Sequence, residues 1–163
     1  MRNTVVVLLL ALLMAGPMSA APLDAPNRIF QGADLFGLQY ATEPQIRPDG
    51  RVVAYVRGSF DIMTDRARQS IWLIDVETGE QTPLVAGAGS HTSPRWSADG
   101  GRLAYVSTAE GGRPQLFARW MQSGQTAKLA ELLSAPADLA WSPDGRWIAF
   151  TMFTPDEAAK LGD

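Results

Sequence analysis

The segment WSPDGRWIAF at residues 141–150 decides the fold, because two closely similar segments precede it, IRPDGRVVAY at 46–55 and WSADGGRLAY at 96–105. In each copy an Asp lies five residues before an Ala and six residues before a Tyr or Phe. The copies are spaced by 50 and then 45 residues. A repeat of this length is typical of the four-stranded blades of a β-propeller.

Each copy predicts a tight turn between two strands. The first strand ends at Ile46, Trp96 or Trp141, and Pro48 and Pro143 preset the backbone of the turn that follows. The Asp can hydrogen-bond its own backbone, and the Gly after it supplies a left-handed residue. The second strand is apolar on both faces, as a blade covered by a neighbour on each side requires.

Third and fourth strands repeat as well. The segment IWLIDVETGE at 71–80 matches LFARWMQSGQ at 116–125, and each is followed by an outer strand containing Leu84 or Leu129. Gly79 and Gly124 are the expected hairpin-turn glycines. The five additional residues of the first period therefore lie between its second and third strands, where we expect a long charged loop at 61–68.

The predicted fold class is all-β, a β-propeller fragment of four-stranded antiparallel blades with two blades and the start of a third. A ring typically takes four to eight blades, so the remaining blades are expected partners that complete the fold. The expected divisions are a signal peptide at 1–21, a linker and N-terminal segment at 22–42 with a short helix or turn at 33–38, and a partial propeller at 43–163 with blades at about 43–88, 89–134 and 135–163, the last incomplete. A further helix is expected to start with Thr154 as its N-cap and Pro155 in its first position, and Glu157 lies three residues after the cap.

The N-terminus predicts export. Arg2 precedes an uninterrupted apolar run at 5–15, and the small residues Ser19, Ala20 and Ala21 follow. This run is shorter than the roughly 20 residues that a membrane span needs. We expect a periplasmic or secreted protein with no membrane association after cleavage. The alternative is an uncleaved N-terminal anchor or a buried core helix.

Composition excludes several classes of function. The chain of 163 residues has a formal net charge of −3 and no cysteine. The charge argues against a nucleic-acid partner, since that binding depends on Lys and Arg neutralising many phosphates. Without cysteine there are no disulfides, thiol nucleophiles or thiolate metal sites.

The segment at 141–150, together with ADLF at 33–36 and SPRWS at 93–97, resembles the N-terminal propeller of exported bacterial serine peptidases of the prolyl oligopeptidase family, of dipeptidyl and acylaminoacyl peptidase type. The resemblance covers residues 28–163. It implies a propeller of about seven or eight blades that caps a C-terminal α/β-hydrolase domain and admits only oligopeptides. The Ser, Asp and His of the family's triad lie in that hydrolase domain, which this sequence does not reach.

Two alternatives stay open at this point. Ser-Pro-Asp-Gly hairpins also mark Tol-type periplasmic propellers, which bind other proteins and catalyse nothing. The segments DIMTDR at 61–66 and GRPQL at 112–116 favour the peptidase group. The third possibility is a truncated gene product without a function of its own.

No catalytic, cofactor-binding or metal-binding residue is predicted within this chain, and no cofactor is expected. Ser90 and His91 lack the G-x-S-x-G elbow of a hydrolase nucleophile, so we expect them in a flexible inter-blade loop. Asp49, Asp99 and Asp144 each stand alone before Gly, without the dense acidic pattern of a calcium loop, and turn formation explains them.

Basic and aromatic side chains are the remaining candidates for ligand contacts. Arg66, Arg68, Arg95 and Arg119 could grip a peptide carboxylate, although solvated rim charges would look the same in sequence. The Trp and Tyr residues of the repeats are expected to pack in the core rather than to form a ligand platform.

Overall fold

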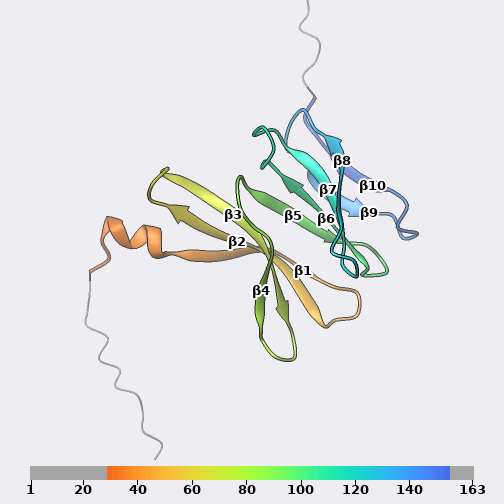
Figure 1. Ribbon diagram of the computed structural model, residues 1–163, viewed down its shortest axis with the longest axis horizontal. Coiled ribbons are helices and arrows are strands. Elements are labelled where there is room, and N and C mark those ends of the chain that lie inside the picture. Colours follow the sequence, from red (N-terminus) through yellow and green to blue (C-terminus); the bar gives the residue numbers. More distant parts are fainter. Residues whose placement is uncertain (1–28, 155–163) are drawn as a thin grey trace, which may run out of the picture. The chain divides into compact units, whose positions relative to one another are not determined.

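The computed structural model describes residues 29–154 (Figure 1). A short 3-10 helix, η1 (Gly32–Gly37), precedes the strands. In chain order these are β1 (Gln39–Ile46), β2 (Val52–Asp61), β3 (Arg66–Asp75), β4 (Gln81–Val85), β5 (His91–Trp96), β6 (Arg102–Ser107), β7 (Gln115–Trp120), β8 (Thr126–Glu131), β9 (Ala137–Trp141) and β10 (Ile148–Thr151). Within the described range, no helix is long and apolar enough to cross a bilayer.

The strands form two complete sheets and one hairpin. Strands β1 to β4 pair in sequence order as one antiparallel sheet, here called blade 1. Strands β5 to β8 repeat this arrangement as blade 2, and β9 and β10 form an antiparallel pair. The predicted all-β architecture of four-stranded antiparallel blades is therefore confirmed.

The repeated Asp closes the same turn in all three copies. Its Oδ1 accepts the backbone N–H two residues later, over 3.0 Å for Asp49, 2.9 Å for Asp99 and 3.0 Å for Asp144. The glycines that follow these residues have φ of 74°, 67° and 65°. Glycine adopts this left-handed conformation without steric cost, so the turn residues act as the sequence predicts.

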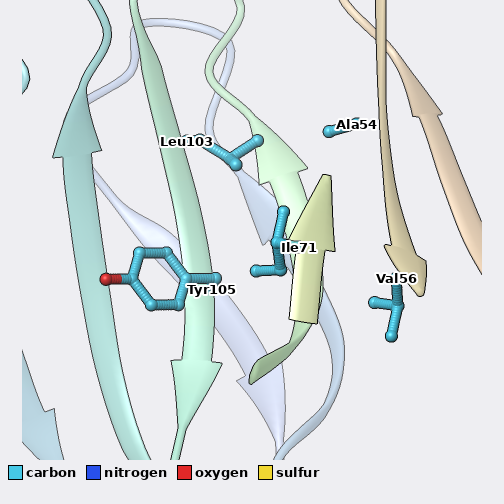
Figure 2. Close-up of a cluster of buried hydrophobic side chains, with 5 residues drawn as sticks. All are labelled: Ala54, Val56, Ile71, Leu103 and Tyr105. Carbon is cyan, nitrogen blue, oxygen red and sulfur yellow. The ribbon is translucent and has the colours of Figure 1, made fainter. Parts of the chain in front are cut away.

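Alternate residues of one strand pack against different neighbours. Leu103 and Tyr105 of β6 join Ala54, Val56 and Ile71 of blade 1 in one buried cluster (Figure 2). A second cluster contains the intervening residues of β6 and side chains from β7 to β9: Ala104, Val106, Leu116, Leu132 and Leu139. Strand β6 is apolar on both faces because each face covers a different blade.

The prediction of a long loop at 61–68 is wrong. Strand β2 continues to Asp61 and β3 begins at Arg66, so these residues pair directly and only 62–65 remain as a turn. The Asp61 carboxylate accepts the backbone N–H groups of Met63 and Thr64 over 2.9 and 3.3 Å, and it forms an ion pair with Arg68. Charged residues are therefore accommodated by cross-strand pairing, and the additional residues lengthen a hairpin.

The N-terminal part of the described range contains the expected short helix, η1. Strand β1 begins at Gln39, so its first residues fall within the linker and N-terminal segment expected at 22–42. The expected signal peptide at 1–21 and the helix expected from Pro155 lie outside the described residues.

Replacing Leu103 with Ala tests the blade-to-blade core. Leu103 is completely buried, so we expect Leu103→Ala to lower the free energy of unfolding by roughly 2 to 5 kcal/mol through lost burial and a residual cavity. Urea unfolding of the full chain, followed by tryptophan fluorescence, measures this. The matched variant Leu133→Ala, at a side chain that is 76% exposed, should change stability by less than about 0.5 kcal/mol. Equal losses in the two variants would contradict this packing.

Candidate functional site

The first strand of each blade carries a bulge at one repeated position. Glu43, Ser93 and Asp138 have φ of 51°, 56° and 55°, and each lies six residues before the turn Asp. The pairing of β1 with β2 and of β5 with β6 shifts register directly after these residues. Residues other than glycine rarely adopt this left-handed conformation. Its recurrence at one position of the repeat shows that the bulge is a constant part of the blade.

Two residues after the bulges at Glu43 and Ser93, a backbone carbonyl accepts a hydrogen bond from the next blade. The indole Nε1–H of Trp96 donates to the carbonyl oxygen of Gln45 over 3.0 Å. The indole Nε1–H of Trp141 donates in the same way to the carbonyl oxygen of Arg95 over 2.9 Å. Gln45 and Arg95 are equivalent repeat positions, so successive blades are joined by the same hydrogen bond.

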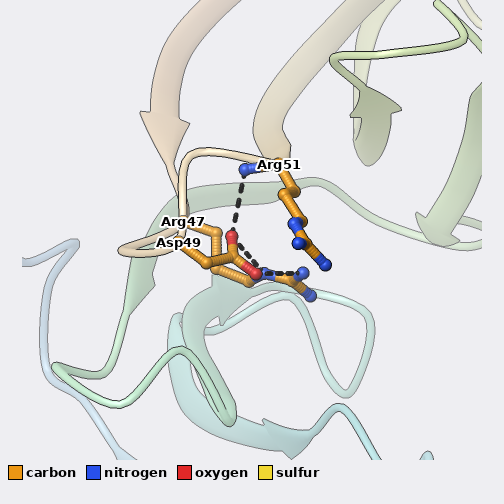
Figure 3. Close-up of polar contacts among 3 residues, drawn as sticks. All are labelled: Arg47, Asp49 and Arg51. Carbon is orange, nitrogen blue, oxygen red and sulfur yellow. Dashed lines mark hydrogen bonds and ion pairs between the residues drawn. The ribbon is translucent and has the colours of Figure 1, made fainter.

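An arginine of the preceding blade stacks on each of these indoles. The guanidinium carbon of Arg47 lies 5.9 Å from the Trp96 ring centroid, and that of Arg102 lies 4.8 Å from the Trp141 centroid. Arg47 also grips Asp49 through two side-chain hydrogen bonds (Figure 3). These bonds, with the N–H of Arg51, lower the pKa of Asp49 to about 2. The turn carboxylate thus remains ionised and holds Arg47 beside the tryptophan.

Among the four arginines considered for carboxylate binding, three have structural partners: Arg68 is paired with Asp61, and Arg95 and Arg119 donate hydrogen bonds. Arg95 donates from Nε to the Leu139 carbonyl over 3.0 Å and from Nη1 to the Pro94 carbonyl over 2.8 Å, so it links blade 2 to β9. Arg119 contacts the Thr126 hydroxyl at 3.4 Å. Arg66 and Arg68 lie together on the lengthened β2–β3 hairpin.

Arg66 and Arg68 line a cleft of about 760 Å³. Its opposite wall consists of the β4–β5 linker, residues 88–90, and Thr108 after β6. The cleft was not anticipated from the sequence, because it depends on the hairpin arms that replace the expected loop.

His91 lies at the start of β5 and is only 4% exposed, so its expected place in a flexible loop is wrong. It aligns across the sheet with Ser107 and Gln115, which are each 3% exposed. Both ring nitrogens of His91 and the Oε1 of Gln115 lack a hydrogen-bond partner among the described residues. The His91 ring instead meets Tyr105 edge-on at 6.4 Å. Burial without a partner disfavours the charged form of His91 more strongly than the neutral form.

Neither hydrolase nor metal chemistry is assembled in the range 29–154. Because neither His91 nitrogen bonds to a hydroxyl, the neighbouring Ser90 is not activated by it. No group of three or more His, Asp or Glu side chains is placed to hold a metal ion within that range. The turn carboxylates of Asp49, Asp99 and Asp144 are instead bonded to their own turn amides.

The aromatic residues divide into two groups. Tyr55 and Tyr105 are buried, as expected. Trp147 and Trp120 are 70% and 39% exposed, which corrects the expectation that the repeat tryptophans all face the core. Both line a cavity of about 310 Å³ beside the β9–β10 hairpin, and among the described strands β10 pairs only with β9. No third strand of that blade covers them within the described residues.

The fold agrees with one known family, since the model of the TolB beta propeller domain, PD40, matches residues 36–156. The chain belongs to this family. The uncharacterized peptidase YuxL of Bacillus subtilis is 33% identical over 126 residues, which are 77% of this chain and 19% of that protein. Dipeptidyl-peptidase 5 of Porphyromonas gingivalis is 25% identical over 114 residues, which are 70% of this chain and 16% of that protein.

A solved structure supports the same fold. The acylaminoacyl peptidase of Pyrococcus horikoshii superposes with a TM-score of 0.60 at 20% sequence identity, covering 70% of this chain and 17% of that one. This PD40 propeller is therefore similar in sequence to part of two peptidases and shares its fold with the matched region of the acylaminoacyl peptidase. The chain spans less than a fifth of the length of these two curated relatives.

Substituting Trp96 with Phe tests the inter-blade hydrogen bond. The change removes the indole donor and leaves the half-buried Gln45 carbonyl unpaired, so we expect a loss of about 1 to 2 kcal/mol in unfolding free energy. Urea unfolding of the full chain, followed by circular dichroism, measures it. Trp147→Phe makes the same chemical change at a side chain that is 70% exposed and should cost less than about 0.5 kcal/mol. A Trp96→Phe variant as stable as Trp147→Phe would refute the role of this bond.

Because His91 is buried, we expect the protein to lose stability in mild acid. Burial lowers the pKa of His91 from its ordinary value of 6.5, so the unfolded state binds more protons as the pH falls below that value. Stability should therefore begin to fall below about pH 6.5 and continue to fall until the folded-state pKa is passed. The turn carboxylates, whose pKa values are lowered, lose their contribution only in stronger acid.

The measurement is the melting temperature of the full chain between neutral pH and pH 5, compared with His91→Gln. The variant, which does not titrate in this window, should show a flatter dependence on pH. Parallel curves for the two proteins would contradict the assignment to His91.

Proposed function

We propose that this chain is the non-catalytic propeller portion of an exported serine peptidase that cleaves oligopeptides. The observation that carries this proposal is the 33% identity to the peptidase YuxL over 126 residues, at 19% of that protein's length. The triad would then belong to a C-terminal α/β-hydrolase domain. This assignment is consistent with the described residues, where the buried His91 makes no hydrogen bond to a hydroxyl.

The role proposed for the blades is to gate access to the hydrolase domain by size. A gate of this kind must resist deformation, since a flexible ring would admit folded proteins. The repeated tryptophan–carbonyl bonds and the two buried clusters between blades supply that rigidity. Oligopeptides are the substrate class that such a passage would admit.

We further propose a periplasmic or secreted location, with the signal peptide at about 1–21. The support is the apolar run at 5–15 after Arg2, with small residues at its end. A net charge of −3 gives nucleic acid no broad basic surface to bind, and we propose no membrane association after cleavage.

A second candidate function is a non-enzymatic periplasmic propeller that binds another protein. The family model that matches residues 36–156 is described by the TolB propeller, and the Tol-Pal system protein TolB of Alcanivorax borkumensis is 35% identical over 60 residues. Those 60 residues are 37% of this chain, against 77% for YuxL, so the peptidase assignment is preferred.

The test is active-site labelling of the native, full-length protein with a fluorophosphonate, which reacts with activated serines. We expect one labelled serine beyond Asp163, together with hydrolysis of short blocked peptides but not of the same sequences inside a folded protein. His91→Gln is the matched control. It removes the single histidine of this chain, and labelling should persist at neutral pH.

Loss of labelling in His91→Gln at a retained fold would place the catalytic base in this chain and contradict the proposal. Absence of any labelled serine and of hydrolysis would favour the protein-binding alternative.

A further inference from the structure

The cleft between the β2–β3 hairpin and the β4–β5 linker has the size of a ligand site. Its volume of about 760 Å³ lies within the range of small-molecule pockets, about 300 to 1,000 Å³. One wall is formed by Thr64, Arg66, Ala67 and Arg68 at the turn and the start of β3. This wall exists because β2 and β3 each have ten residues, whereas β6 and β7 of blade 2 each have six.

The opposite wall is fixed in place by the backbone. The Ser90 N–H donates to the Thr108 hydroxyl and the Thr108 N–H donates to the Ser90 carbonyl, both over 3.0 Å. Gly89 has a φ of 75°, and a Cβ built on it would lie 2.7 Å from the backbone nitrogen of Ala109. The linker therefore packs directly against the chain after β6, and the cleft has two defined walls.

The cleft carries one positive charge that no acidic side chain pairs with, the guanidinium of Arg66. Arg68 is paired with Asp61, whose carboxylate also accepts two turn amides and has a lowered pKa. Within residues 29–154, the Arg66 side chain has neither an ion-pair nor a hydrogen-bond partner, although it lies on the cleft wall. No acidic side chain is among the residues that line the cleft.

The polar side chains opposite Arg66 are hydroxyls that can donate. Thr108 accepts the Ser90 N–H, which leaves its hydroxyl proton available, and Ser90 is also among the residues that line the cleft. A guanidinium with two hydroxyl donors matches an acceptor of single negative charge. A carboxylate fits this set, because a guanidinium can bind it through two parallel hydrogen bonds.

We propose that this cleft binds the terminal carboxylate of an oligopeptide, with Arg66 as the charged contact and the Ser90 and Thr108 hydroxyls as further donors. The choice of a peptide as the source of the carboxylate rests on the proposed peptidase function. The site would hold the C-terminal end of a peptide at the junction of blade 1 and blade 2. Arg66 is then a binding residue and takes no part in catalysis.

The test is calorimetric titration of the full-length protein with N-acetyl-glycylglycine and, separately, with its C-terminal amide. We expect the free acid to bind at least about tenfold more tightly than the amide, because charge-assisted hydrogen bonds are lost with the carboxylate. Arg66→Gln should weaken binding of the acid by a similar factor without changing the melting temperature, since this side chain is exposed. Titration with N-acetyl-aspartate amide, which carries only a side-chain carboxylate, distinguishes a terminal from an acidic side-chain source.

Arg51→Gln is the matched control, because it removes the same charge from an exposed position at the other end of β2. Binding of the acid should then stay within about twofold of the parent protein. Equal affinity for acid and amide, equal effects of Arg66→Gln and Arg51→Gln, or tighter binding of the aspartate amide would each overturn the proposal.

The proposed function fails separately from this inference. Hydrolysis of blocked peptide amides tests the peptidase without needing a terminal carboxylate. Hydrolysis of blocked peptide amides without binding of N-acetyl-glycylglycine would contradict the cleft assignment and leave the peptidase assignment intact. Arg66-dependent binding of N-acetyl-glycylglycine, in a protein without a labelled serine, would contradict the peptidase assignment and leave the cleft assignment intact.

Discussion

One hydrogen bond, from a tryptophan indole to a backbone carbonyl of the preceding blade, sets the geometry on which the structure depends. The carbonyl of Gln45 or Arg95 can reach the next blade because a left-handed residue bulges the strand two positions earlier. Such a conformation costs on the order of 1 kcal/mol or more for a residue other than glycine. At Glu43 and Ser93 the hydrogen bond to the next blade offsets this strain, and Asp138 has the same conformation at the equivalent position of the third copy.

Apolar burial supplies most of the stability between blades, whereas the indole bond supplies direction. A neutral hydrogen bond contributes only about 0.5 to 1.5 kcal/mol net, while each fully buried Leu or Ile contributes about 1.5 to 3 kcal/mol. Burial is non-directional and specifies the relative position of two sheets less sharply than a hydrogen bond does. The combination of Leu103 in the core and Trp96 at the edge therefore holds the blades in one relative position.

The repeat phrase was sufficient to predict the strands, the turns and the apolar character of both faces of β6, because each follows from local spacing and turn chemistry. The bulges were missed although Pro44 and Pro94, which lack an N–H, follow two of them and offered a signal. The hairpin arms at 61–68 and the burial of His91 could not be read from local sequence, since both depend on pairing between distant residues. The cleft beside Arg66 was hidden for the same reason.

Under the proposed function, these blades would belong to a longer hydrolase and restrict access to it. The most direct test is to read the coding sequence past the codon for Asp163 and to compare it with the intact mass of the native protein. We expect further blade repeats followed by a G-x-S-x-G segment and then an Asp and a His, in the chain order of an α/β-hydrolase. Further blades without that segment, or a stop directly after Asp163 matched by the intact mass, would contradict the proposed function.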